Sequence, residues 1–146
     1  MTSVHRIALG PETTALDQGR SAHGRWRWGY QHADAPETGT PIPAALRITQ
    51  DADRLVFVMA GGPAAAFLAD RMVTYLWTRE SLNDDWPRDL GAWFGDPEQW
   101  DDVPPVEGRT GFICGRLERN LPGGRIYLAW LGMSGIRLLD RSNNDL

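Results

Sequence analysis

Two glycines and a proline stand where an expected strand gives way to an expected helix. Gly61, Gly62 and Pro63 follow the apolar run Arg54–Ala60 and precede Ala64–Arg79, a segment in which apolar residues recur every three or four positions. Free N–H groups at the start of a helix attract an anion, so this junction could bind phosphate. Neither a G-x-G-x-x-G pattern nor a P-loop accompanies it, and a tight turn that needs small residues is the simpler interpretation.

The segment Gly132-Met133-Ser134-Gly135 places a serine between glycines, as the nucleophile turn of many hydrolases does. That turn requires a glycine two residues after the serine, but Ile136 stands there, and no helix is expected to follow. We therefore expect a hairpin turn here rather than a catalytic serine.

Composition excludes several other kinds of chemistry. All 15 basic residues are arginines, so sites that need a lysine, such as a P-loop or a Schiff base, are excluded. Cys114 is the single cysteine, which rules out an internal disulfide and a multi-cysteine zinc site. The three histidines lack the spacing of a zinc-binding helix; they are His5, His23 and His32. The formal net charge of -4 argues against sequence-independent binding to nucleic acid, which needs an excess of positive charge.

Tryptophans fall in two groups that could each bind a partner. Arg25-Trp26-Arg27-Trp28 alternates basic and aromatic residues, a pattern that could stack on nucleic-acid bases but is more simply a strand whose tryptophans face the core. The second group is spaced seven residues apart and flanked by aspartates; it comprises Trp86, Trp93 and Trp100. Tryptophan is enriched at binding hot spots, so these three could form a partner-binding surface. They could equally pin an irregular insertion onto the domain.

The elements that must position these residues follow from hydrophobic periodicity. The expected strands are Arg6–Leu9, His23–Gln31, Ala44–Ile48, Arg54–Ala60, Thr110–Leu117, Arg125–Leu131 and Ile136–Leu139, and the expected helix is Ala64–Arg79. Proline and glycine interrupt residues 83–105, where we expect short helical turns rather than one helix. Strands that are separated from helices in this way predict an α+β domain of antiparallel sheets flanked by helices.

The length of 146 residues is that of one domain. We expect a flexible lead-in over residues 1–22, the domain over 23–140 with a Trp/Asp-rich insertion at 83–105, and a frayed tail over 141–146. The longest apolar run, Leu55–Leu68, is too short and too broken to cross a membrane. The first ten residues lack the apolar stretch of a signal peptide, so we expect a cytoplasmic protein.

Three segments, in order, resemble the front half of a metal-dependent Ser/Thr protein phosphatase of the 2C type (PPM family). His32–Ala35 resembles the family's Asn-Glu/Gln-Asp-Ala motif, and Leu55–Asp70 resembles its apolar strand, Ala-Asp-Gly-Met-Gly-Gly turn and helix start. Ile126–Leu139 is similar to its strand, Gly-Asp-Ser-Arg turn and return strand. The resemblance implies two facing antiparallel sheets flanked by helices, an incomplete sandwich here. In the family, acidic residues at the sheet edge hold two Mg²⁺ or Mn²⁺ ions, whose bridging hydroxide attacks phosphorus.

The sequence departs from this pattern at the metal ligands. Asp34 matches the acidic residue of the first motif, and Gly62 keeps a glycine whose carbonyl helps to bind the metal. The bridging aspartate of the second motif falls on Gly61, which offers no side-chain oxygen. Met133 and Gly135 stand in place of the aspartate and arginine of the third motif. One surviving aspartate cannot neutralise two neighbouring divalent ions, which prefer several oxygen ligands.

The family's phosphate-contacting arginine also has no direct match. It falls on Gly29, although Arg25 and Arg27 lie nearby and could contact a phosphate. The chain ends about where the family's second half, with the remaining metal carboxylates, would begin.

These departures predict a catalytically degenerate 2C-type domain that acts as a binding or regulatory module for a protein partner and needs no cofactor. The alternative is a Mn²⁺- or Mg²⁺-dependent phosphatase completed by a partner chain, which would also cover an exposed sheet edge in an oligomer. A third hypothesis is an interaction module that binds through the Trp/Asp segment Asn83–Asp102. None of the three involves nucleic acid or a membrane.

Overall fold

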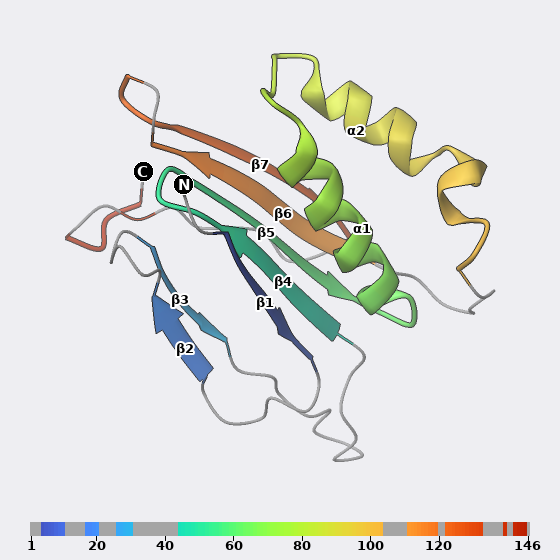
Figure 1. The fold of residues 1–146 in the computed structure, drawn as a ribbon, viewed down its shortest axis with the longest axis horizontal. Coiled ribbons are helices and arrows are strands. Elements are labelled where there is room, and N and C mark those ends of the chain that lie inside the picture. Colours follow the sequence, from blue (N-terminus) through green and yellow to red (C-terminus); the bar gives the residue numbers. More distant parts are fainter. Residues whose placement is uncertain are drawn as a thin grey trace.

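A five-stranded antiparallel sheet, in the order β1-β4-β5-β6-β7, forms the centre of the computed structural model (Figure 1). The structure describes residues 4–10, 17–20, 26–30, 44–103, 111–119, 122–132, 139 and 142–145. The sheet strands are β1 (His5–Leu9), β4 (Ala44–Gln50), β5 (Arg54–Gly61), β6 (Gly111–Glu118) and β7 (Arg125–Leu131), while β2 (Asp17–Arg20) and β3 (Arg27–Tyr30) pair separately. The helices are α1 (Ala65–Thr78), α2 (Trp86–Phe94) and the short 3₁₀ helix η1 (Pro97–Trp100). The predicted α+β class is confirmed.

The sheet face that carries α1 holds the main core (Figure 1). Because side chains alternate along a strand, Val56, Val58 and Ala60 of β5 all point to this face, and all are fully buried. The α1 side chains buried in the same core recur every three or four residues; they are Ala65, Leu68, Ala69, Met72, Val73 and Leu76. The predicted helix is therefore confirmed, with its apolar stripe against the sheet.

The opposite sheet face carries a second, smaller core beside the β2–β3 pair. Trp26 is buried there among leucine and isoleucine side chains of β4 and β5. Its indole Nε1 donates a hydrogen bond to the backbone oxygen of Asp51 at 2.9 Å, which fastens the start of β3 to the β4–β5 turn. Trp28 packs against the same cluster, so the predicted placement of both tryptophans toward the core is confirmed.

Asp51 makes the turn between β4 and β5. Its carboxylate Oδ1 accepts hydrogen bonds from the N–H groups of Asp53 and Arg54, each at 2.8 Å. An aspartate at this position satisfies the backbone groups of the turn locally, which explains why β4 and β5 pair without a longer loop.

The junction between β5 and α1 is a tight turn. Gly62 has a φ of 110°, which favours glycine, and its carbonyl oxygen accepts a hydrogen bond from the N–H of Ala65 at 3.1 Å. Pro63 therefore lies inside this turn, ahead of α1, which begins at Ala65. The junction is therefore a tight turn that needs a glycine at position 62, which agrees with the simpler of the two interpretations of the sequence.

Residues 83–105 contain a regular helix where only short turns were expected. α2 spans nine residues although it includes Pro87 and Gly91. Pro87 stands in the first turn, where its missing N–H costs no helical hydrogen bond. Leu90 is buried and the aromatic residues of α2 pack against the main core, so tertiary packing holds this helix in place.

The segment expected to be a flexible lead-in supplies two of the strands. β1 contains the strand expected near Arg6–Leu9 and pairs with β4 in a register that runs from His5 opposite Gln50 to Leu9 opposite Leu46. β2 pairs with β3. Residues His5–Leu9 and Asp17–Arg20 therefore belong to the folded part of the chain.

A hairpin joins β6 to β7, which correspond to the strands expected over Thr110–Leu117 and Arg125–Leu131. Gly123 and Gly124 have φ values of 75° and 68° and connect β6 to β7, which pair from Phe112 opposite Leu131 to Glu118 opposite Arg125. Of the further strand expected over Ile136–Leu139, only Leu139 lies within the described residues.

Candidate functional site

The residues expected to keep traces of a metal site lie only partly within the described structure. Gly61 is the last residue of β5, and Gly62 begins the turn into α1. Asp34, Arg25, Met133 and Gly135 lie outside the described residues, as does the side chain of Arg27. Within the described ranges, no group of three or more His, Cys, Asp and Glu side chains is placed to hold a metal ion.

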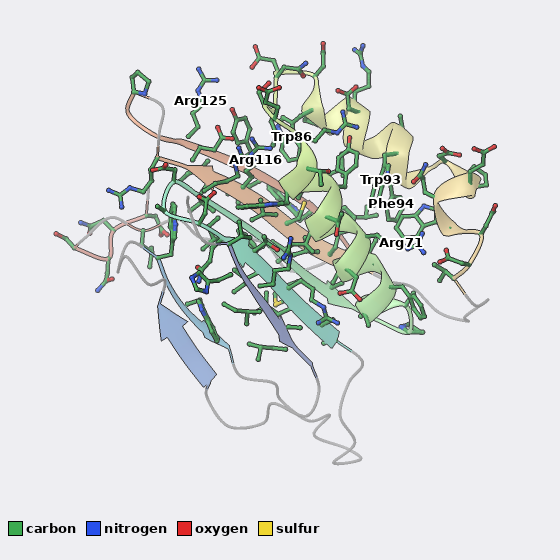
Figure 2. The ribbon with its side chains drawn as sticks, in the orientation of Figure 1. Arg71, Trp86, Trp93, Phe94, Arg116 and Arg125 are labelled. Carbon is green, nitrogen blue, oxygen red and sulfur yellow. The ribbon has the colours of Figure 1, made fainter. Side chains whose placement is uncertain are left out.

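The three evenly spaced tryptophans attach the α2–η1 segment to the rest of the molecule; two of them, Trp86 and Trp93, are labelled in Figure 2. Trp93 packs on Tyr75 of α1, with ring centroids 4.6 Å apart and planes inclined by 31°. Trp100 meets the edge of Trp93 at a centroid distance of 5.2 Å, and Trp86 meets Tyr127 of β7 at 6.1 Å. All three tryptophans are half-buried, and these contacts hold the α2–η1 segment against the rest of the molecule. Their role in binding a partner stays a prediction.

An apolar pocket opens where the start of α1 meets the end of the α2–η1 segment. Its described lining consists of Ala64, Phe67, Leu68, Phe94, Trp100 and Val103, and its volume is about 240 Å³. We call this hollow the α1–η1 pocket. Phe67 is an apolar residue on the otherwise polar side of α1, where it is 43% exposed. That phenylalanine is the clearest sequence signal of the pocket, because Leu68, Phe94 and Trp100 also belong to or pack against the main core.

Hydrogen bonds and ring contacts hold the walls of the α1–η1 pocket together. The Trp100 indole Nε1 donates to the backbone oxygen of Phe94 at 2.9 Å. Arg71 of α1 donates to the backbone oxygen of Gln99 and to the carboxylate of Asp102, and its guanidinium lies 5.7 Å from the Trp100 ring centroid. The pocket is therefore held between two elements that are tied to each other.

Negative charge concentrates around this part of the molecule. Residues 83–102 contain seven Asp or Glu and one Arg, a formal charge of -6, whereas the whole chain carries -4. Glu98 and Asp101 are exposed, and Asp101 and Asp102 separate two lining residues of the pocket. Two exposed carboxylates, Glu98 and Asp101, are therefore close in the chain to the lining residue Trp100.

A second hollow lies along the outer side of α1 and is more polar. It has a volume of about 510 Å³, and its described lining is Asp70, Arg71, Thr74, Tyr75, Thr78, Trp93 and Gln99. Arg71 and Trp93, which help to hold the α1–η1 pocket, therefore also form a wall of this groove.

The most buried charged pair of the described chain has a structural task. Arg116 of β6 is fully buried, and its Nε donates to Glu118 at 2.6 Å. Its other nitrogens donate to the backbone oxygens of Leu76, Arg79 and Glu80 at 3.0, 2.6 and 2.9 Å. Burial lowers the pKa of Arg116, and the hydrogen bond to Glu118 opposes that shift. Sequence spacing gave no sign of this pair.

Cys114 is not placed as a nucleophile. Its side chain is fully buried in the main core, and burial raises the pKa of the thiol to about 12, partly opposed by a hydrogen bond with the backbone of Ala129. A thiol that stays neutral and enclosed at ordinary pH does not attack a substrate.

Comparison with protein-family models, with curated proteins and with solved structures finds no match for this chain. Among the described residues, no helix has both the length and the apolar character needed to cross a membrane.

Proposed function

We propose that this chain is a binding module without phosphatase activity of its own, on a scaffold that resembles the front half of a 2C-type phosphatase. The order of elements supports the resemblance: an apolar strand, β5, leads through Gly61 and Gly62 into α1, and the β6–β7 hairpin follows. The partner of such a module is a protein.

The observation that carries the proposal is the residue at the end of β5. The resemblance puts the bridging aspartate of the phosphatase at Gly61, whose backbone ends the strand without a side chain. Two divalent ions a few ångströms apart repel each other strongly and require carboxylates between them. Met133, in place of the third motif's aspartate, removes a further oxygen ligand.

A binding role is supported by the α1–η1 pocket. An apolar hollow with a rigid aromatic wall beside charged residues is the usual form of a site that recognises an apolar group. None of the described lining residues of that pocket is a residue of the expected metal site.

The test is a turnover assay with p-nitrophenyl phosphate and a phosphoserine peptide in millimolar Mn²⁺, with an active 2C-type phosphatase as the positive control. We expect the same signal with and without EDTA, and weak Mn²⁺ binding by calorimetry. Turnover that depends on Mn²⁺ and disappears in EDTA would refute the proposal.

A second candidate is the phosphatase that becomes active when a partner chain completes it. Ile126 and Trp130 of β7 favour it: they are 51% and 56% exposed, and alternation puts them on the sheet face away from α1. A partner could pack on this face and supply carboxylates. This candidate predicts Mn²⁺-dependent turnover only in a mixture with a co-purifying chain, and light scattering that shows a stable monomer without any such chain counts against it.

A further inference from the structure

We propose that the α1–η1 pocket binds an apolar side chain presented by a cationic segment of a partner protein. This inference rests on the proposed function as a binding module, but it uses no part of the resemblance to phosphatases. The juxtaposition that suggests it is an apolar hollow of about 240 Å³ whose lining residues Phe94 and Trp100 belong to an acidic segment of formal charge -6.

The lining specifies an apolar anchor. Every described lining residue is apolar, and three of them, Phe67, Phe94 and Trp100, are aromatic. The volume lies below the range of roughly 300–1,000 Å³ that is usual for drug-sized ligands. It therefore suits one or two side chains of a peptide, such as a leucine or a tryptophan. Covering the exposed ring of Phe67 supplies part of the binding free energy.

The acidic residues next to Trp100 favour positive charge in the partner segment around that anchor. Asp101 and Asp102 lie between the lining residues Trp100 and Val103, and Glu98 lies two residues before Trp100. The guanidinium of Arg71 offsets part of this charge, but it is already held by Asp102 and by a backbone oxygen. Glu98 and Asp101 are exposed and remain on the surface for an incoming cation. Opposite charge at the rim of an interface speeds association and selects partners.

The pocket is also preorganised. The Trp100–Phe94 hydrogen bond and the packing of Trp93 on Tyr75 fix the aromatic wall before a ligand arrives. A site whose walls are fixed loses less conformational entropy on binding, so a short peptide segment is sufficient.

The test uses a fluorescein-labelled 12-residue peptide in which arginines and lysines surround a central Leu-Trp pair, and it measures fluorescence anisotropy. Two matched peptides carry either Ala-Ala in place of Leu-Trp or glutamates in place of the basic residues. We expect saturable binding of the first peptide that weakens as salt is raised. Loss of the anchor should weaken binding by about 10-fold or more, and the acidic peptide should not bind.

Variants of the protein locate the site. Phe67→Ser should weaken binding of the first peptide about 10-fold. The double variant Glu98→Gln/Asp101→Asn should weaken it by about two- to fivefold and reduce its dependence on salt. The matched control Asp84→Asn makes the same chemical change in the same acidic segment, before α2, and should leave binding unchanged. All four positions are exposed, so circular dichroism melting should match that of the unaltered protein.

The proposal is overturned if the first peptide does not bind, if the Ala-Ala or acidic peptide binds equally well, or if Phe67→Ser binds as the unaltered protein does. If the first peptide does not bind and the turnover assay shows no Mn²⁺-dependent activity, the pocket proposal is wrong but the proposed function stands. Mn²⁺-dependent turnover instead overturns the proposed function, whatever the titration shows.

Discussion

Cys114 and Gly115, two neighbouring residues of β6, lie on opposite faces of the sheet, and each has a size that suits the packing on its face. Cys114 is enclosed in the main core below α1. Gly115 faces the other side, where the rings and methyl groups of Phe57 and Leu128 occupy the place of a side chain. In this strand, burial therefore controls the chemistry of Cys114, and the lack of space for a Cβ requires glycine at position 115.

Burial of Cys114 makes stability depend on pH in the alkaline range. The pKa of the folded thiol is raised to about 12, so the unfolded chain loses this proton first and is favoured as the pH rises above about 9. We expect the free energy of unfolding, relative to that of Cys114→Ala, to be about 2 kcal/mol lower at about pH 10.5 than at pH 7. Urea unfolding of both proteins at the two pH values measures this difference, and a pH-independent difference would contradict the assignment.

Gly115 should not tolerate even the smallest side chain. A Cβ there would lie 2.5 Å from Cε1 of Phe57 and 2.8 Å from Cδ2 of Leu128. We expect Gly115→Ala to lower the free energy of unfolding by about 1–3 kcal/mol, because the packed rings must shift. Gly91→Ala is the control: its Cβ would meet no atom within 4 Å, and alanine in the α2 helix should stabilise by up to about 1 kcal/mol. Urea denaturation measures both variants. Equal losses in the free energy of unfolding for Gly115→Ala and Gly91→Ala would contradict the proposed packing at Gly115.

At the scale of elements, α1 depends on a residue from the distant strand β6. Its last turn contains no basic residue, and Arg79 at its end is extended, so the carbonyl groups there need outside donors. Arg116 supplies them to Leu76, Arg79 and Glu80, with Glu118 balancing its charge. This pair ties the C-terminal end of α1 to the sheet.

Replacing Arg116 should therefore be among the most damaging single changes. Arg116→Met leaves Glu118 buried without its cation and three carbonyl groups without a donor, and we expect a loss of about 3–5 kcal/mol in the free energy of unfolding. The double variant Arg116→Met/Glu118→Met should recover part of this loss, because no buried charge remains. Guanidinium denaturation of both variants measures the effect. A double variant less stable than the single one would contradict this explanation.

Patterns within a few residues predicted most of these elements, and contacts between distant residues explain the rest. Hydrophobic patterns within single segments predicted β4 to β7 and α1: a continuous apolar run for β5, and three- to four-residue spacing for α1. The helix α2 was missed because Pro87 and Gly91 weaken its local signal, while its packing on α1 and the core favours it. The α1–η1 pocket was missed for a similar reason, since its lining spans positions from Ala64 to Val103.

At the scale of the whole molecule, the two sheet faces differ in how they are covered. The α1 face is filled by two helices and an aromatic layer. The other face is closed around Trp26, whereas Ile126 and Trp130 of β7 remain exposed. Among the described residues, two apolar surfaces differ in their neighbouring charge: the α1–η1 pocket takes Phe94 and Trp100 from the segment of formal charge -6, whereas Ile126 and Trp130 lie outside that segment. The neighbouring negative charge therefore favours a cationic peptide at the α1–η1 pocket, whereas the exposed apolar face of β7 would suit a partner sheet.

The most direct measurement is a titration of the ¹⁵N-labelled protein with the cationic Leu-Trp peptide, followed by ¹H–¹⁵N correlation spectra. If the chain is a binding module that acts through the α1–η1 pocket, the Trp100 indole resonance and the amides from Ala64 to Leu68 shift together and saturate. Resonances of β7 should stay in place. Shifts centred on Ile126 and Trp130, or an unchanged spectrum at saturating peptide, would contradict the account.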